Sequence, residues 1–236
     1  MNILIAIPCL YGAEHTKEAI DSVVNTPATI LLIDNGSEPR VKSLIEAYRH
    51  RDNVVIYSFP ENVYVNPAWN MAIDFFLQNG EFTHIAIMNS DLILYRDWYK
   101  HLETALINNF IPLPIVTQDR DLLNASHESI VTEFGPPITV DGGTPGIFIC
   151  LNREMVEKVG LIPEDIKVWF GDQYIYTILR EIGYKTITEP CLLCYHYWSQ
   201  NVQKVKGIGE IIENDKRKWE LIVKKLMDDK ILSNTI

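Results

Sequence analysis

The sequence predicts an α/β protein with a mostly parallel central sheet that is flanked by helices. Short apolar runs alternate with amphipathic stretches of about 10 to 15 residues in the first half of the chain. These apolar runs have the length of strands that are covered on both faces, as strands in parallel sheets are. With 236 residues, 47% of them hydrophobic, the chain is long enough for one large domain with a full core.

The first half of the chain predicts four units, each made of one strand and one helix. The strands are the apolar runs in "NILIAIP", "TILLID", "NVVIYSF" and "HIAIM", and an amphipathic stretch follows each of them. Strands that are separated by helices in this way form βαβ units, in which the strands run parallel. In chain order, the expected elements are 2–8, 13–24, 29–34, 39–49, 53–59, 66–78, 84–88 and 96–108.

After Pro112 the alternation ends. Residues 111–146 are rich in Pro, Gly, Ser, Thr and Asp, which predicts a short strand followed by irregular loops that cover a site. Regular structure then returns, and Gly160 and Gly183 mark the ends of two helices. The expected elements are strand 146–151, helix 153–160, helix 172–183, strand 184–190 and helix 209–230. The last helix has an apolar face of Ile212, Trp219, Ile222, Val223 and Leu226.

Composition and charge limit the classes of protein to consider. The N-terminal "MNILIAIPCLYG" lacks the basic region of a signal peptide, and no apolar stretch approaches the roughly 20 residues of a membrane-spanning helix. We therefore expect a soluble, cytoplasmic protein with no membrane span. The net charge of −10 argues against a general nucleic-acid binder. Residues 196–236 differ, with eight Lys and Arg against six Asp and Glu, which leaves room for a local contact with a polyanion.

The four cysteines are too few for a disulfide framework. Cys191 and Cys194 form a C-x-x-C pattern, which could indicate a zinc or redox site. However, "PCLLCYHYW" has the pattern of a strand, where an offset of three residues places the two thiols on opposite faces. There is also no second C-x-x-C to complete a metal site. We therefore expect structural cysteines.

Polar residues follow two of the predicted strands, at the edge of the sheet where ligands of open α/β folds bind. Asp34 precedes a turn-forming Asn-Gly-Ser; its carboxylate could accept hydrogen bonds from a ribose or a base, or could simply make the turn. Asn89, Ser90 and Asp91 follow "HIAIM". Asp91 offers the oxygen ligand that Mg²⁺ or Mn²⁺ prefers, with Asn89 on the same side, although an Asx-turn or a helix cap is the alternative.

Four segments in this order resemble the family 2 glycosyltransferases, which have the GT-A (nucleotide-diphospho-sugar transferase) fold. "ILIAIPCLYGAEHTKEAIDSVV" with "ILLIDNGSEP" is similar to their opening, "ENVYVNPAWNMAI" to their Asn-containing third segment, and "MNSD" to their D-x-D motif. The segment from "GTPGIFICL" to "REIGYK" is similar to the one that ends in their Glu-Asp signature. The resemblance spans roughly residues 3–200. The short chain and basic tail also resemble compact bacteriophage enzymes.

The resemblance implies a site for a nucleotide-sugar donor and a divalent cation. Pro8 and Tyr11 would border the nucleotide, Asp34 would contact the base or ribose, and Asn89 would approach the ribose or a bound water. The third segment would add Asn62 and Asn70. "GGTPG", residues 142–146, suits close approach of the backbone to a donor sugar. The nucleotide-sugar-binding residues expected are Pro8, Tyr11, Asp34, Asn62, Asn70, Asn89 and Gly143. Asp91 and His196 are the expected metal ligands, for Mn²⁺ or Mg²⁺; a buried structural histidine is the alternative for His196.

Asp172 is the expected catalytic residue. It opens a helix, whose N-terminus stabilises a carboxylate, so N-capping is the alternative role. Its place in the family pattern implies a general base that takes the proton of the acceptor hydroxyl in an inverting transfer. The sequence departs from the family pattern at three positions: Asn89 replaces the first Asp of D-x-D, Gly171 replaces the Glu of Glu-Asp, and Tyr64 stands where the family often has Gly.

We therefore expect a single GT-A domain over residues 1–236, with a nucleotide-binding half at 1–116, an acceptor and catalytic half at 117–200, and a C-terminal helical tail at 201–236. Its expected activity is metal-dependent transfer of a sugar from a UDP-sugar to a hydroxyl acceptor, most simply a saccharide. One alternative is glycosylation of hydroxymethylated pyrimidines in bacteriophage DNA. Alternatives of another class are a nucleotidyltransferase and a non-catalytic sugar-binding protein. The aromatic residues Trp169, Phe170, Tyr197 and Trp198 are expected mainly in the core.

Overall fold

The main sheet has five strands in the order β3-β2-β1-β4-β8. A computed structural model describes residues 1–106, 110–140, 146–198 and 204–233 of the chain. The first four strands of this sheet run parallel, as predicted, and β8 pairs antiparallel with β4. The strands are β1 (Ile3–Cys9), β2 (Thr29–Asn35), β3 (Val54–Phe59), β4 (His84–Met88) and β8 (Phe148–Asn152).

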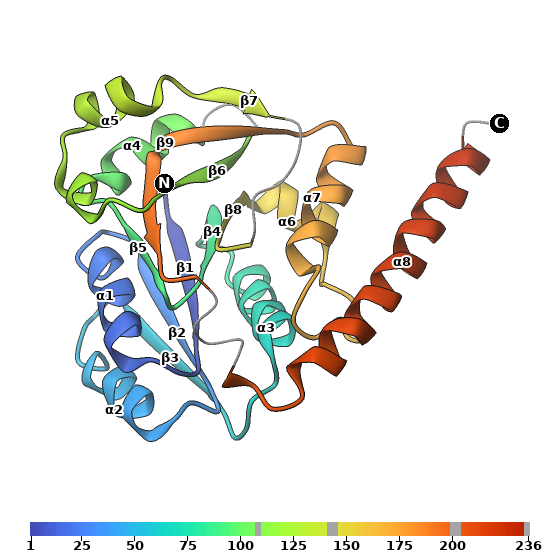
Figure 1. The fold of residues 1–236 in the computed structure, drawn as a ribbon, viewed down its shortest axis with the longest axis horizontal. Coiled ribbons are helices and arrows are strands. Elements are labelled where there is room, and N and C mark those ends of the chain that lie inside the picture. Colours follow the sequence, from blue (N-terminus) through green and yellow to red (C-terminus); the bar gives the residue numbers. More distant parts are fainter. Residues whose placement is uncertain (107–109, 141–145, 199–203, 234–236) are drawn as a thin grey trace.

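Helices cover both faces of the main sheet (Figure 1). The helices on one face are α1 (Ala13–Val23) and α2 (Pro39–Ala47), and those on the other are α3 (Val65–Gln78), α6 (Arg153–Val159) and α7 (Gly171–Glu181). Alternate residues of β1 belong to the two cores. Ile3, Ile5 and Ile7 pack in the first core, whereas Leu4 and Ala6 pack in the second. Burial on both faces explains why this strand is a continuous apolar run.

A second sheet has the order β5-β9-β6, and β7 also pairs with β9. Its strands are β5 (Leu92–Leu94), β6 (Phe110–Thr117), β7 (Ile138–Val140) and the 12-residue β9 (Lys185–His196). The two strand patterns predicted over 184–198 are therefore one strand.

Cys191 and Cys194 lie in β9 as buried free thiols. Burial raises the pKa of both thiols far above the usual range, so neither is a reactive thiolate at neutral pH.

The segment after β6 is more regular than the sequence suggested. It contains a 3₁₀ helix η1 (Arg120–Asn124), a helix α5 (His127–Phe134) and β7, whereas irregular loops were predicted. The prediction was wrong because the polar residues here act as helix caps. Ser126 accepts a hydrogen bond from the Ser129 N–H at 3.2 Å, and the buried Ile130 anchors α5 to the core. The remaining helix of the first half is α4 (Trp98–Ala105).

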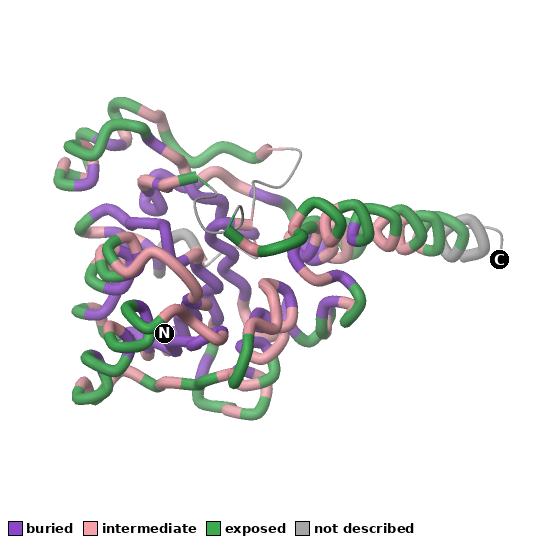
Figure 2. Tube along the Cα trace, turned by 60° about the horizontal axis from the view of Figure 1, so that its bottom comes forward, coloured by how far each residue is buried: buried purple, intermediate pink, exposed green. Residues whose placement is uncertain are grey.

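The last helix, α8 (Ile208–Ser233), runs past α7 and then projects beyond the rest of the protein (Figures 1 and 2). Its predicted apolar face is only half-buried. Trp219 on this face stacks on Phe170, and Ile222 packs against the second core, whereas Leu221 and Met227 on other faces are 66% and 60% exposed. In the described part of the chain, none of the helices is long and apolar enough to cross a membrane.

Candidate active site

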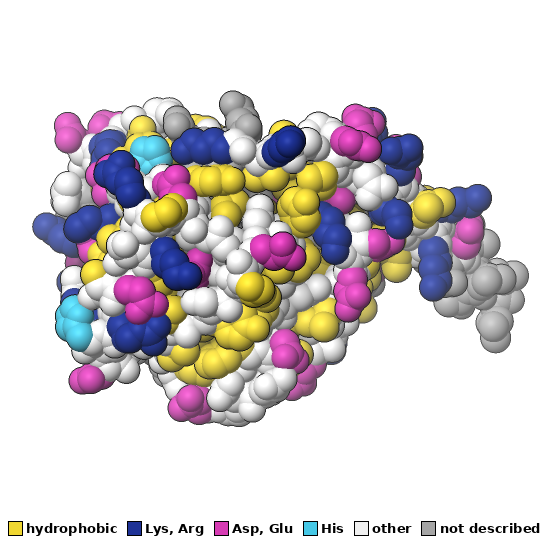
Figure 3. All heavy atoms as spheres, turned by 90° about the horizontal axis from the view of Figure 1, so that it is seen from below, with side chains coloured by type: hydrophobic (Ala, Val, Ile, Leu, Met, Phe, Trp, Pro, Cys, Tyr) yellow, Lys and Arg dark blue, Asp and Glu magenta, His cyan; other side chains and the backbone are white. Residues whose placement is uncertain are grey.

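A cavity of about 820 Å³ opens at the edge of the main sheet where the parallel strands end. Residues at the ends of β1 and β2 and directly after β4 line one side, and the loop before α7, with α7 itself, lines the other. Seen from below Figure 1, hydrophobic side chains gather across the middle of the face and charged ones lie mostly around them (Figure 3). This edge is where open α/β sheets bind ligands.

Asp91 and His196 meet in this cavity, 105 residues apart in the chain. Asp91 follows β4 and precedes β5, and the antiparallel pairing of β5 with β9 places Leu92 opposite His196. The Asp91 Oδ1 and the His196 Nε2 are 3.0 Å apart, and the two residues are only 5% and 4% exposed. The strand pairing therefore brings the two expected metal ligands together.

This pair fits a divalent cation of the Mn²⁺ or Mg²⁺ type. A carboxylate oxygen and an imidazole nitrogen are both ligands that Mn²⁺ accepts. Within the described residues there is no group of three or more His, Cys, Asp or Glu that could hold a metal by itself. Mg²⁺ and Mn²⁺ sites commonly have only one or two carboxylates and take their other ligands from substrate phosphates and water. The donor set thus fits a cation that is bound together with a diphosphate.

Three of the expected nucleotide-sugar residues, Pro8, Asn62 and Asn89, line the cavity. The Asn62 side chain accepts a hydrogen bond from the Tyr64 N–H at 2.8 Å, which shapes the turn before α3. Tyr64 has a φ of 71°, in the left-handed region that favours glycine. The conformation typical of Gly is therefore kept at this position although the residue differs from the family pattern.

Asp34 does not line the cavity. It is 2% exposed, accepts a hydrogen bond from the Ser37 N–H at 2.8 Å and lies 3.8 Å from the Lys42 ammonium. These contacts are those of the alternative role, a turn-forming aspartate. The neighbouring Asn35 lines the cavity instead, and its amide binds the backbone of Val63 and Tyr64.

Two further expected residues are also placed outside the cavity lining. Tyr11 lies beside it, under the Lys204 ammonium at 5.7 Å from the ring centroid. Asn70 forms two hydrogen bonds of 2.8 Å with the backbone of Ile162, so it fastens α3 to the segment after α6. Gly143 lies outside the described residues.

Asp172 lies in the first turn of α7 and faces the cavity. Its Oδ2 accepts a hydrogen bond from the Gly146 N–H at 2.8 Å. A Cβ on Gly146 would lie 2.7 Å from the Asp172 Cβ and 2.7 Å from the Trp69 ring, so only glycine allows this approach. Burial raises the pKa of Asp172, against the opposing effect of hydrogen bonds from the backbone N–H groups of Gln173, Gly146 and Asp172. A raised pKa in a cavity suits a group that exchanges protons.

Aromatic residues that were expected in the core line the cavity. Trp169, Phe170 and Trp198 all contribute to its wall, and Trp169 and Trp198 are 48% and 49% exposed. Arg180, on the same side of α7 as Asp172, was not singled out from the sequence and also lines the cavity. By contrast, none of residues 117–140 does; in the described part of the segment that was predicted to cover a site, 111–146, the cavity is lined by Gly146 alone. Residues 117–140 pack against β9 instead.

The first half of the chain matches a known family over a continuous stretch. The family model described as glycosyl transferase family 2 matches residues 4–134, which is more than half of the chain. The protein belongs to glycosyl transferase family 2. The resemblance found in the sequence is confirmed. A search of curated proteins gave no match.

Solved structures confirm the GT-A fold of this family 2 glycosyltransferase. GalNAc-T7 with UDP, GalNAc and Mn²⁺ superposes with a TM-score of 0.59 at 14% identity, over 83% of this chain and 43% of that chain. S. aureus TarS 1–349 in complex with UDP gives a TM-score of 0.62 at 13% identity, over 83% and 60% of the two chains. The chain thus spans less than two thirds of either structure.

This family 2 protein keeps one acid where the family pattern has Glu-Asp, and its packing explains the change. A Cβ on Gly171 would lie 2.2 Å from the Asn66 Oδ1. Asn66 is 1% exposed and donates hydrogen bonds to the carbonyls of Ile166 and Trp169, at 3.2 and 3.1 Å. A glutamate at 171 would push Asn66 away from these carbonyls. The acid that is retained, Asp172, is the one that faces the cavity.

Proposed function

We propose that this glycosyltransferase transfers a sugar from a UDP-sugar to a hydroxyl group of a saccharide acceptor, with Mn²⁺ or Mg²⁺ bound to the donor. The observation that carries the proposal is the shared cavity: a buried Asp91–His196 pair lies at the strand ends, and Asp172 lies across from the strands on α7. The complexes of GalNAc-T7 and TarS with UDP support the choice of nucleotide.

The donor occupies the side of the cavity formed by the strand ends. Asn35, Asn62 and Asn89 offer amide groups there for the uridine and ribose, next to the apolar Pro8. Asp91 and His196 would hold the cation, which would supply positive charge that stabilises the leaving diphosphate. These six residues come from segments that the folded sheet fixes in place, so the donor site is formed before the acceptor binds.

Asp172 acts on the acceptor. Its carboxylate is oriented by hydrogen bonds from backbone N–H groups, among them that of Gly146, and it accepts the proton of the acceptor hydroxyl. The hydroxyl oxygen forms a bond to the anomeric carbon as the bond from that carbon to the diphosphate oxygen breaks. The proton moves to Asp172 and the electron pair leaves with the diphosphate. A single displacement of this kind inverts the anomeric carbon.

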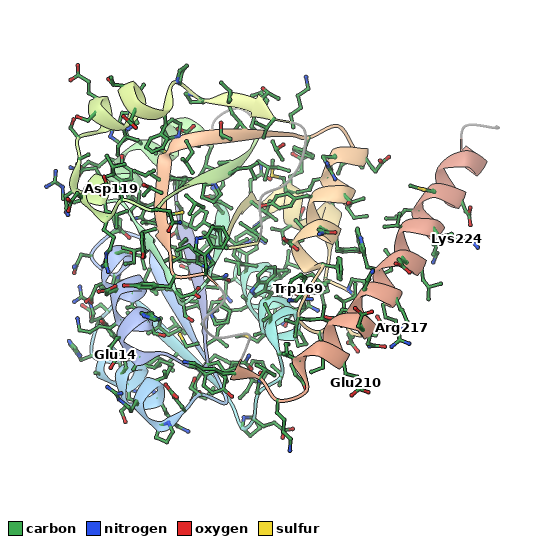
Figure 4. The ribbon with its side chains drawn as sticks, viewed as in Figure 1. Glu14, Asp119, Trp169, Glu210, Arg217 and Lys224 are labelled. Atoms are coloured by element: carbon green, nitrogen blue, oxygen red, sulfur yellow. The ribbon has the colours of Figure 1, made fainter. Side chains whose placement is uncertain are left out.

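The exposed aromatic rings favour a saccharide acceptor. Trp169 is labelled in Figure 4 between α3 and α8, and its half-exposed ring lies on the wall that Asp172 shares. Aromatic faces with polar groups beside them suit sugar rings, and Gln173 and Thr177 of α7 supply such groups. Lys218 of the C-terminal tail forms an ion pair with Asp165 at 2.6 Å, so its charge is already partly neutralised. This pairing argues against DNA as the acceptor.

A thermal-shift survey of nucleoside diphosphates tests the proposal. UDP should raise the melting temperature and Mn²⁺ should enlarge the shift, because a ligand that binds only the native state stabilises it. Asp91→Asn should remove the effect of Mn²⁺, whereas Asp74→Asn, an exposed aspartate on α3, should not. If no nucleoside diphosphate shifts the melting temperature at millimolar concentration with Mn²⁺ present, the proposal is wrong. Transfer that persists only on DNA, and falls steeply with salt, would replace the saccharide with DNA.

A further inference from the structure

The buried end of α8 holds a carboxylate against the backbone of the loop before α7. Asp215 is 0% exposed although it lies in a helix that is otherwise largely exposed. Its Oδ1 accepts a hydrogen bond from the Lys167 N–H at 2.9 Å, and its Oδ2 accepts from the Val168 and Trp169 N–H groups at 2.7 and 3.0 Å. Three successive N–H groups around one anion form a nest, which stabilises the ionised carboxylate.

The same loop is held from its other side by α3. The Asn66 amide donates to the carbonyls of Ile166 and Trp169, and the Asn66 N–H donates to the Lys167 carbonyl at 2.9 Å. Asp215 thus binds the donors of the loop and Asn66 binds its acceptors. In the described part of the chain, no other element forms hydrogen bonds with these backbone N–H and carbonyl groups of residues 166–169. The position of the loop therefore depends on Asp215 and Asn66.

This loop forms one wall of the cavity, and it continues directly into helix α7 with Asp172. Val168, Trp169 and Phe170 line the cavity, and Phe170 has a φ of 66° immediately before α7 begins. Trp219 of α8 stacks on Phe170, with ring centroids 6.1 Å apart and planes at 11°. Helix α8 therefore contacts this wall twice, through a carboxylate and through an aromatic ring one turn further along.

We infer that Asp215 is a positioning residue for the acceptor and that α8 is part of the acceptor site. The inference rests on the proposed function, since it assumes that the acceptor binds against Trp169 and Phe170. The donor side is built by Pro8, Asn35, Asn89 and Asp91, none of which contacts α8 through a described hydrogen bond. Loss of Asp215 should therefore weaken acceptor use and spare donor binding.

Asp215→Asn separates this role from general stabilisation. Both carboxylate oxygens accept N–H groups, so an amide must turn an NH₂ group toward at least one backbone donor. The wall shifts, but the helix keeps its length and its Trp219 contact. Glu213→Gln is the matched control, because Glu213 is exposed on the same helix two residues away and is not part of the cavity lining.

The experiment compares wild type, Asp215→Asn and Glu213→Gln in two measurements. The first is the affinity and stoichiometry of UDP with Mn²⁺ by calorimetry. The second is steady-state transfer from UDP-glucose, UDP-GlcNAc or UDP-GalNAc to a panel of p-nitrophenyl β-glycosides of glucose, galactose, GlcNAc and GalNAc. A misplacement of about 1 Å can cost up to about 100-fold in rate, so kcat/KM for the acceptor should fall about 10- to 100-fold in Asp215→Asn, with a rise in acceptor KM.

The UDP affinity should stay within about twofold, and the stoichiometry should be unchanged, in both variants. A merely structural role would lower the UDP stoichiometry and kcat together and leave acceptor KM unchanged, which would overturn the inference. An Asp215→Asn variant with wild-type acceptor kinetics would also overturn it. So would a wild-type protein that binds UDP but uses no glycoside of the panel. Absence of UDP binding in the wild type would instead refute the proposed function.

Discussion

Replacement of Asp172 by asparagine tests the catalytic assignment most sharply. Asparagine keeps the oxygen that accepts the Gly146 N–H at 2.8 Å and fits the same space beside Trp69. It cannot accept a proton. General-base assistance is worth about 100- to 10,000-fold in rate, which corresponds to about 2.7 to 5.4 kcal/mol in activation free energy. We expect turnover to fall by a factor in this range while UDP binding remains unchanged.

The effect of this substitution on stability should be small, and its sign follows from the pKa. Burial raises the pKa of Asp172 above its value in the unfolded chain, so its stabilising contribution is complete only below the usual aspartate pKa and is lost as the pH rises through the raised value. Asparagine does not ionise, so at neutral pH the variant does not lose this stability. It also weakens the hydrogen bond from Gly146 by about 1 kcal/mol, because the acceptor is no longer charged. The two effects oppose each other.

The assay is single-turnover transfer, so that chemistry and not product release limits the observed rate. Glu157→Gln, an exposed change of the same kind on α6, serves as the control and should behave as wild type. Product stereochemistry is an independent check, since a base-assisted single displacement inverts the anomeric carbon. A stable Asp172→Asn variant with near-normal turnover, or a product of retained configuration, would refute the assignment.

Three further predictions follow from the site. Transfer should fall on the acid side of its pH profile at a pH above the ordinary aspartate range, because the base must be ionised and burial raises the pKa of Asp172; a profile that is flat down to pH 4 would contradict this. Asp91→Asn should abolish the Mn²⁺ dependence of UDP binding, measured by calorimetry, while Asp74→Asn retains it. Gly171→Glu should lower the free energy of unfolding by about 1 to 3 kcal/mol, because its Cβ would overlap Asn66; denaturant titration measures this, and an unchanged midpoint would show that Asn66 can move freely.

The parallel sheet could be predicted from the sequence because burial on both faces leaves a direct signal. The run from Ile3 to Ile7 serves two cores at once, so it carries no polar residue. The convergence of Asp91 with Asp172 and His196 was predictable for a related reason. Each lies next to the end of a strand or the start of a helix, and an α/β sheet brings such positions to one edge.

Contacts between a side chain and a distant backbone group could not be predicted, since they produce no periodic pattern. Asn70 was expected at the donor site, yet it binds Ile162 on the neighbouring segment. Asp215 is one acid among many in a charged helix, and only the fold shows that it is buried beneath the cavity wall. An aspartate at the end of a strand is typical both of a turn and of a ribose-binding site, so the sequence could not distinguish the two roles of Asp34. Its hydrogen bond from the Ser37 N–H corresponds to the turn.

Calorimetric titration of the wild-type protein with UDP tests the central claim most directly. In the presence of Mn²⁺ we predict saturable binding at one site per chain, which weakens strongly when the cation is removed by EDTA. The Asp91–His196 pair in the cavity is the basis for that coupling. Heat that does not exceed dilution at millimolar UDP with Mn²⁺ present, or binding that is equally strong with EDTA, would contradict the claim that this cavity is a metal-assisted UDP-sugar site.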